Sequence, residues 1–332
     1  MNKQERLENA LIGGVTDHVP ASFWCHWPGD DQRTADLARS TVEFQQTYDW
    51  DFVKVTPFSA YCVADYGVQT EWRGDVSGDR AISKYLVKRS LAWTELRTLE
   101  PSRGELGKHL EVIRLIQEAL HDDDVPIITT IYSPLTQAAM IGGTEMVLRN
   151  MRMRPDRLRT ALNIITESTL RFIDYLKRTG IAGIHYSAQY ASFELMSEEE
   201  YKIFGSPYDL KILGTLPAEW WLNILQLSCN APMFTLAAEY PVQAINWDTN
   251  TTKPNMENAK TLFPGALCGG LSHQQHLHMG TPSMIRDVAH DVLNLMGMRR
   301  LILSAGAAFP VSTPRSNIRA VRKSVDSTGT AG

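Results

Sequence analysis

The chain lacks the signs of a protein that binds nucleic acid or lies in a membrane. Its formal net charge is −4 over 332 residues, and its basic residues are scattered, so no basic surface for nucleic acid is predicted. No apolar run is long enough to span a bilayer. We therefore expect a cytoplasmic protein that acts on small molecules, without nucleic-acid or membrane partners.

Cysteine is scarce as well. The four cysteines lie far apart in the sequence, and no Cys-x-x-Cys pair occurs. This pattern is typical of reduced thiols in a cytoplasmic protein and gives no sign of a disulfide framework.

The glycine-rich loops that hold nucleotide phosphates are also missing. No Gly-x-Gly-x-x-Gly follows the first predicted strand, and no Gly-x-x-x-x-Gly-Lys occurs anywhere. The sequence therefore does not predict a nucleotide cofactor held by such a loop.

What the chain does contain is a regular alternation of strand-like and helical segments. About eight apolar segments are mostly followed by helical patterns, which favours a closed (β/α)8 TIM barrel of the α/β class over an open sheet. The predicted strands are 21–27, 51–56, 126–131, 181–186, 224–229, 242–247, 266–271 and 301–304.

Three further segments complete this predicted architecture. An N-terminal helix at 3–13 precedes the barrel, and the mixed segment 62–104 is interpreted as an insertion after the second strand, over one mouth of the barrel. We expect residues 1–325 to form a single domain and residues 326–332 to be a flexible tail.

Residues 223–250 form the segment with the clearest chemical content. A strand, a short helix and a second strand follow one another, with polar residues where each strand stops. The carboxyl ends of parallel strands carry the chemistry of such folds. The polar residues to question first are therefore Gln226, Cys229, Asn230, Asn246 and Asp248.

Asp248 is a candidate catalytic residue, as an anionic anchor or proton acceptor, although a turn cap would also explain it. Asn230, Asn246 and Trp247 are candidate cofactor contacts, and Asn230 is equally suited to starting the next helix. Cys229 is interpreted as a small buried side chain, because no basic partner is near it in sequence.

Other strand ends supply the remaining candidates. Gln189 and Tyr132 are candidate catalytic residues, since an amide can recognise the amide-like edge of a pterin and Tyr132 ends a strand. The further candidate cofactor contacts are Trp24, His26, Tyr186 and His273. Trp24 and His26 share one strand face and can reach the mouth, although core packing is an equal alternative. The histidines at 273, 276 and 278 match no known ligand spacing, so no metal site is predicted.

Several short motifs, in their order and spacing, resemble the uroporphyrinogen decarboxylase superfamily and, within it, the branch of one-carbon methyltransferases. The motifs are Thr-Asp-His-Val-Pro (16–20), Tyr-Ser-Pro-Leu-Thr (132–136), Gly-Ser-Pro-Tyr-Asp-Leu (205–210), Gly-Thr-Pro (280–282) and Ser-Ala-Gly-Ala-Ala-Phe-Pro-Val-Ser-Thr-Pro (304–314) followed by Asn317-Ile318. The resemblance implies a (β/α)8 barrel with its site at the carboxyl mouth.

The chain departs from the residues that the decarboxylase uses. No arginine pair follows the first predicted strand, and the aspartate, tyrosine and histidine positions fall near Phe58, Met140 and Ala307. A porphyrinogen with many carboxylates needs cationic partners, which this mouth is not expected to offer. Decarboxylation of uroporphyrinogen is therefore not expected.

The zinc ligands of the methyltransferase branch are also replaced. The resemblance implies a His-x-Cys pair after the fifth strand and a Cys after the eighth. These align with Leu227, Cys229 and Ala307 in this sequence. One ligand of three remains, which cannot hold zinc in tetrahedral geometry, so no zinc is expected.

The leading hypothesis is a zinc-independent methyltransferase, with demethylation or dehalogenation as its chemistry. A methyl or halomethyl group would move from a methyl halide, ether or amine to a tetrahydrofolate-type pterin. The first alternative is a corrinoid-dependent component that works with a corrinoid protein, either with turnover or as a binding subunit. The second is a non-porphyrin decarboxylase or lyase, which would require Lys54 to face the cavity. The sequence does not fix the oligomeric state; the resemblance allows a homodimer, because family members often pair.

Overall fold

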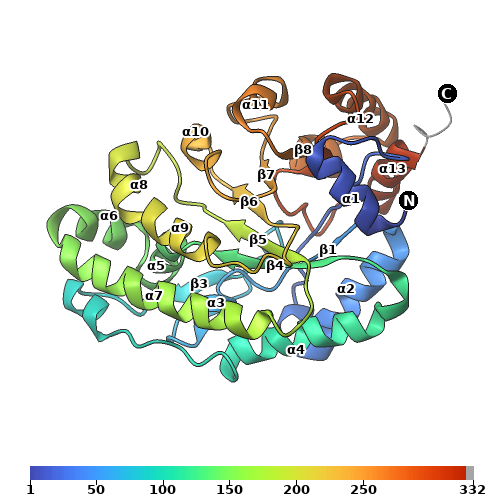
Figure 1. Cartoon of the computed structure of the whole chain (residues 1–332). Coiled ribbons are helices and arrows are strands. Elements are labelled where there is room, and N and C mark those ends of the chain that lie inside the picture. Colours follow the sequence, from blue (N-terminus) through green and yellow to red (C-terminus); the bar gives the residue numbers. More distant parts are fainter. Residues whose placement is uncertain (327–332) are drawn as a thin grey trace.

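The computed structural model describes residues 1–326, and its centre is one curved parallel sheet (Figure 1). Seven strands pair in the order β1-β4-β5-β6-β7-β8-β9. Their bounds are Val53–Val55, Ile127–Tyr132, Gly183–Ser187, Ile224–Leu227, Ala244–Trp247, Ala266–Leu271 and Leu301–Ala305. All six pairings are parallel, as expected for strands joined by helical crossovers.

An extended segment around Ala21 bonds to both edges of this sheet. Leu303 N–H donates to Pro20 O at 2.8 Å, and Ser22 N–H donates to Leu303 O at 3.2 Å. On the other side, Asp51 N–H donates to Ala21 O at 3.0 Å. The predicted strand 21–27 is therefore one isolated bridge at Ala21 and not a regular strand. A regular ladder does not continue toward β1, because the group that donates to Phe52 O is the Ser22 hydroxyl and not a backbone N–H.

Helices surround the outer face of the sheet, as Figure 1 shows. Their bounds are α1 Lys3–Ile12, α2 Thr34–Tyr48, α3 Tyr61–Ala64, α4 Gly104–Ala119, α5 Pro134–Gly142, α6 Thr144–Met153, α7 Pro155–Leu176, α8 Glu198–Phe204, α9 Ser206–Leu213, α10 Phe234–Ala237, α11 Met256–Leu262, α12 Pro282–Met296 and α13 Arg315–Asp326. Several begin at the residues that capping rules favour, with a capping box at Asn2 for α1 and at Ser197 for α8.

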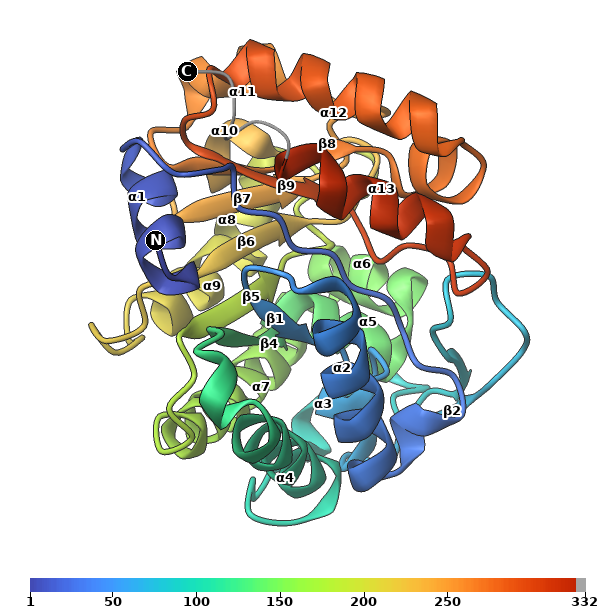
Figure 2. The same cartoon turned by 90° about the vertical axis from the view of Figure 1, so that its right-hand side faces the viewer.

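The helix α1 closes the amino end of the sheet, next to β8 and β9 (Figure 2). Its Leu7 and Leu11 join an apolar cluster inside the sheet together with residues from the strands. Arg6 fixes the helix in place, because its guanidinium donates to Asp51 at 2.6 Å and to Asp17 at 2.7 Å. Asp51 also accepts from Ala21 N–H at 2.7 Å, so this ion network joins α1 to the bridging segment.

The strand–helix–strand unit at 223–250 is confirmed as β6, α10 and β7. Within the segment 62–104, β2 (Gln69–Glu71) and β3 (Ala81–Lys84) pair as an antiparallel hairpin. The tail 326–332 lies outside the described residues, except for Asp326, which ends α13.

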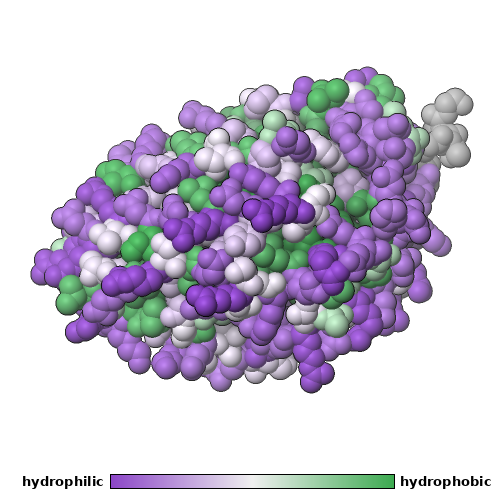
Figure 3. All heavy atoms as spheres, turned by 60° about the horizontal axis from the view of Figure 1, so that its bottom comes forward, coloured by the Kyte–Doolittle hydropathy of each residue, from purple (hydrophilic) through white to green (hydrophobic). Residues whose placement is uncertain are grey.

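The surface seen in Figure 3 is mainly hydrophilic, with hydrophobic side chains scattered between polar ones. Single exposed apolar residues of this kind are normal for globular proteins. Within residues 1–326, no helix has the length and apolar character needed to cross a membrane.

Candidate active site

A pocket of about 220 Å³ opens at the carboxyl ends of the strands. It is lined by Trp24, His26, Lys54, Ser59, Val76, Ser77, Asp79, Thr130, Tyr132, Gln189, Gln226, Ser228, His273, Gln274, Ala307, Ala308 and Pro310. These residues follow or end most of the parallel strands, and Val76, Ser77 and Asp79 come from the segment 62–104. Part of that segment therefore forms a wall of this mouth pocket.

Alternation along the strands explains why this end of the sheet is polar. Side chains two residues apart point to the same face, so Phe52 and Lys54 both face inward, as do Ile224 and Gln226. The first of each pair lies in the inner apolar cluster and the second lines the pocket. The inward face thus changes from apolar to polar toward the carboxyl ends, where the pocket begins.

Lys54 lies at the base of the pocket with 9% of its surface exposed. Its Nζ donates to Thr56 Oγ1 at 3.3 Å and lies 5.1 Å from the centre of the Trp24 ring. Burial lowers the pKa of Lys54 to about 7, against the opposing field of Asp79. Near neutral pH this amine is therefore divided between its charged and neutral forms.

His26 and Asp79 form a second polar group on the same wall. His26 Nδ1 lies 3.9 Å from Asp79 Oδ1. Asp79 also accepts from the N–H of Ser59 at 3.0 Å, from the Ser59 hydroxyl and from Arg80 N–H at 2.8 Å. Burial lowers the pKa of His26 while Asp79 opposes the shift, so its imidazole is neutral at pH 7 and able to accept a proton.

The opposite wall carries neutral hydrogen-bonding groups. Gln226 Oε1 accepts from the Ser187 hydroxyl at 3.1 Å, and Gln226 Nε2 is 3.5 Å from Gly306 O. Ser228 and Gln189 lie beside it, both partly exposed to the pocket. These side chains can orient an acceptor atom of a small ligand without adding charge.

Asp248 and His273 face each other at the third side of the mouth. His273 lines the pocket, and its Nδ1 is 4.0 Å from Asp248 Oδ2. Asp248 Oδ1 accepts from the N–H groups of Asn250 and Thr251 at 3.0 and 3.2 Å. The carboxylate therefore caps the turn after β7, as the alternative interpretation held, and also faces a pocket histidine.

The structure brings five of the sequence-predicted residues together at one pocket: Trp24, His26, Tyr132, Gln189 and His273. Burial raises the pKa of Tyr132, so this phenol stays protonated and can act only as a neutral hydrogen-bonding group. Trp24 lies edge-on to His185, with ring centres 5.0 Å apart.

The other predicted contacts lie elsewhere. Trp247 is fully buried outside the sheet, where its indole N–H donates to Pro254 O at 2.8 Å. Tyr186 also points outward, and its hydroxyl donates to Asp209 at 2.7 Å. Asn246 is buried inside and donates to two backbone carbonyls, while Asn230 is exposed and contacts Glu194.

Lys54 corrects the expectation that the mouth offers no cation. Lys54 was considered only for the lyase alternative, which required it to face the cavity, and it does so. The signal was present, because Lys54 stands between Val53 and Val55 in a fully buried strand. Asp79 gave no such signal, since it lies in an irregular segment whose position depends on tertiary contacts.

The residues at the mouth do not fit zinc. Leu227 is fully buried and packs outside the sheet, so it does not face the mouth, although the resemblance aligns it with a zinc ligand. The two residues that face the pocket from this strand end are Gln226 and Ser228, and Ala307 faces them. Within residues 1–326 no group of three or more His, Cys, Asp or Glu side chains is arranged to hold a metal ion.

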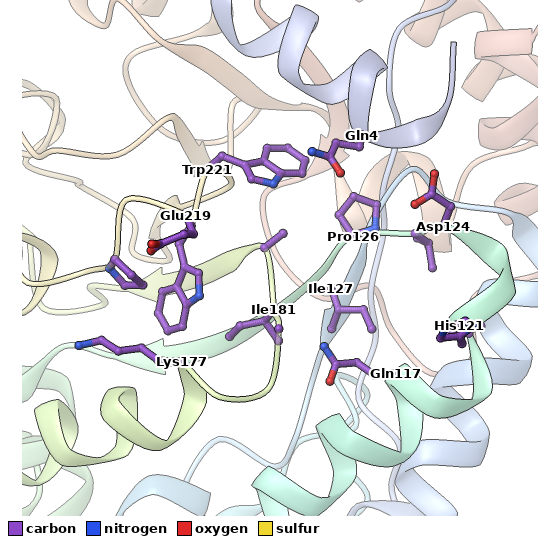
Figure 4. Close-up of a pocket in the computed structure, with 16 residues that line it drawn as sticks. Gln4, Gln117, His121, Asp124, Pro126, Ile127, Lys177, Ile181, Glu219 and Trp221 are labelled. Atoms are coloured by element: carbon purple, nitrogen blue, oxygen red, sulfur yellow. The ribbon is translucent and has the colours of Figure 1, made fainter.

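A larger hollow of about 820 Å³ lies at the amino end of the sheet (Figure 4). Gln4 and Trp221 line one side of it, and Gln117 and Lys177 lie across from them. His121, Asp124 and Glu219 in its rim are exposed, and Lys177 pairs with Asp174 at 2.8 Å. Because barrel enzymes place their chemistry at the carboxyl end, the smaller mouth pocket is the better candidate.

Comparison with known proteins finds one matching family model and two related methyltransferases. Residues 65–328 match the family model described as uroporphyrinogen decarboxylase (URO-D). Two relatives named methylcobamide:CoM methyltransferase MtbA, from Methanosarcina acetivorans and Methanosarcina mazei, are 23% and 22% identical, each over 95% of both chains.

A solved structure described as a methyltransferase from Methanosarcina mazei superposes with a TM-score of 0.87 at 19% identity, covering 99% of both chains. At this identity the likeness shows the fold alone. The match of the family model over most of the chain carries the assignment: this protein belongs to the uroporphyrinogen decarboxylase family.

Proposed function

We propose that this protein is a methyltransferase that moves a methyl group from a corrinoid to a small acceptor in the mouth pocket. The support is the alignment, over 95% of both chains, with relatives whose names give methylcobamide as their substrate. The comparisons give no support for a tetrahydrofolate acceptor or a halomethyl donor. The corrinoid alternative therefore replaces the pterin as the leading proposal.

The size of the pocket indicates which of the two substrates, the small acceptor or the corrinoid, binds inside it. About 220 Å³ is less than the roughly 300–1,000 Å³ of pockets for drug-sized ligands. A small acceptor fits this volume and a corrin ring does not. We therefore propose that the corrinoid, carried by a partner protein, presents its methyl group from above the mouth.

The chemistry is a displacement at the methyl carbon. A methylated corrinoid supplies an electrophilic methyl group. The acceptor forms a bond to this carbon with its lone pair, and the electron pair of the cobalt–carbon bond stays on cobalt. Such a step requires the acceptor to be held in line at near-attack distance. Gln189, Gln226 and Ser228 are positioned to orient the acceptor, and Trp24 and Tyr132 exclude water from it.

An acceptor that carries a proton needs a base. His26 is neutral because burial lowers its pKa, and Asp79 lies 3.9 Å away to stabilise the imidazolium that forms on proton transfer. Since the mouth donor set does not fit zinc, we propose that these side chains, together with Lys54, prepare the acceptor.

A direct test uses methylcobalamin as the methyl donor and a series of small thiols, amines and carboxylic acids as acceptors. The purified, chelator-treated protein should accelerate the loss of the methyl-corrinoid absorption and give methylated acceptor by mass spectrometry. The absence of protein-dependent demethylation with every acceptor, before and after adding a corrinoid protein, would remove the proposal.

A decarboxylase or lyase remains the second candidate, because Lys54 faces the cavity as that mechanism requires. Lys54 would hold the carboxylate that leaves or remains. Release of carbon dioxide from small carboxylic acids without a corrinoid, abolished by Lys54→Met, would favour this candidate over methyl transfer.

We also propose that the segment around Ala21 serves as the eighth strand, so that residues 1–325 form one closed barrel. The support is its hydrogen bonds to β9 on one side and to Asp51, next to β1, on the other. Slow amide exchange at Ser22 and Leu303, comparable to that of the central strands, would agree with closure, and fast exchange there would oppose it.

A further inference from the structure

Lys54 is a buried cation without an anionic partner. Its Nζ has three N–H donors, and the hydrogen bond observed goes to a neutral hydroxyl, Thr56 Oγ1, at 3.3 Å. Within residues 1–326, no carboxylate lies within ion-pair distance of this nitrogen. An ammonium group enclosed in this way is unfavourable unless something completes its coordination.

The charged and titratable neighbours do not supply the missing charge. Asp79 has the strongest opposing field at Lys54, but its oxygens already accept from Ser59 and Arg80 and face His26. Cys25 is a thiol, because burial raises its pKa to about 12. His185, which faces Lys54 from β5, is neutral because burial lowers its pKa, so it contributes no negative charge.

We propose that Lys54 Nζ is the binding site for the carboxylate of a small monocarboxylic ligand that enters through the mouth pocket. Gln226, Ser228 and Gln189 add neutral donors and acceptors around the same cavity, which suits the oxygens of a carboxylate. One cation balances one negative charge, and the nearby Asp79 disfavours a second, so a dianion such as sulfate is excluded.

This inference depends on the proposed function only in one respect. If the chain transfers methyl groups, the carboxylate belongs to the acceptor, whose nucleophilic atom then points out of the pocket toward the corrinoid. The binding site itself requires no corrinoid, and it can therefore be tested separately.

The test measures protection against thermal unfolding by propionate at constant ionic strength, with propionamide as the neutral isostere and sulfate as the dianion. Propionate should stabilise the protein and the other two should not. Affinity should fall about tenfold for each pH unit above about 7, as the ammonium form is lost. Lys54→Met should weaken propionate binding about 10- to 100-fold, as expected for a lost charge-assisted hydrogen bond, while the exposed control Lys211→Met should bind normally.

Equal protection by propionate and propionamide, tighter binding of sulfate, or unchanged binding in Lys54→Met would each overturn the carboxylate site. So would the lack of protection by any anion. Demethylation of methylcobalamin without carboxylate binding would refute the carboxylate site and remain consistent with the proposed methyl transfer. Propionate binding without demethylation would support the carboxylate site and contradict the proposed methyl transfer.

Discussion

The buried amine of Lys54 should destabilise the folded protein in a manner that depends on pH. Its pKa falls from the ordinary lysine value of 10.5 to about 7 in the folded protein, because burial disfavours the charged form. Between these two values the unfolded chain binds more protons than the folded one. Stability must therefore rise with pH through this window and be lowest below about pH 7.

The size of the effect follows from the same values. One pKa unit corresponds to about 1.4 kcal/mol, so the full lowering from 10.5 to about 7 corresponds to about 5 kcal/mol. From about pH 7 to about pH 9, the contribution of Lys54 should increase the free energy of unfolding by about 2 kcal/mol. Lys54→Met, which keeps the length of the side chain and removes the charge, should not show this increase.

The assay is urea denaturation of the wild type and of Lys54→Met at several pH values. The difference between the two free energies of unfolding cancels the titration of all other groups that the substitution leaves unchanged. Lys54→Met should be the more stable protein near neutral pH, and the difference should shrink as pH rises. A difference that stays constant between about pH 7 and about pH 9 would refute the placement of Lys54 as a buried, unpaired amine.

Three further results are expected. Asp79→Asn should lower the pKa of Lys54 further, because the carboxylate that favours the ammonium is lost. This pKa is obtained by comparing the free energy of unfolding of Asp79→Asn with that of the double variant that also carries Lys54→Met. The difference between the two depends on pH, and its midpoint gives the pKa of Lys54. Arg6→Met should lower the free energy of unfolding by about 3–5 kcal/mol in urea, because Asp51 is left buried without its partner. Trp247→Phe should cost about 1–3 kcal/mol from the unsatisfied Pro254 carbonyl and the lost ring area, yet leave propionate binding unchanged, because this side chain lies outside the pocket.

The alternation of elements was predictable because it depends on local patterns. The unit from β6 to β7 lies where its apolar runs indicate, and polar residues do collect at the carboxyl ends of its strands. The segment around Ala21 shows the limit of such patterns. Its apolar run resembles a strand, but a regular ladder depends on partners far away in sequence, and these give only one bridge.

The face of the sheet to which each side chain points was harder to predict, because a shift of one residue exchanges the two faces of a strand. The resemblance aligns Leu227 with a zinc ligand at the mouth, whereas Gln226 and Ser228 of the same strand end line the pocket. Trp247 is a predicted cofactor contact and instead packs against Phe234 outside the sheet. Both errors concern register, which tertiary packing sets.

We propose that the mouth pocket binds a small carboxylate through Lys54 and methylates the molecule that carries it. The most direct test compares the rates of methyl transfer from methylcobalamin to 3-mercaptopropionate and to 1-propanethiol, with the chelator-treated protein. We expect the carboxylate-bearing thiol to react about 10- to 100-fold faster, and we expect Lys54→Met to remove this preference. Equal rates for the two thiols in the wild-type protein, or a preference that survives in Lys54→Met, would contradict it.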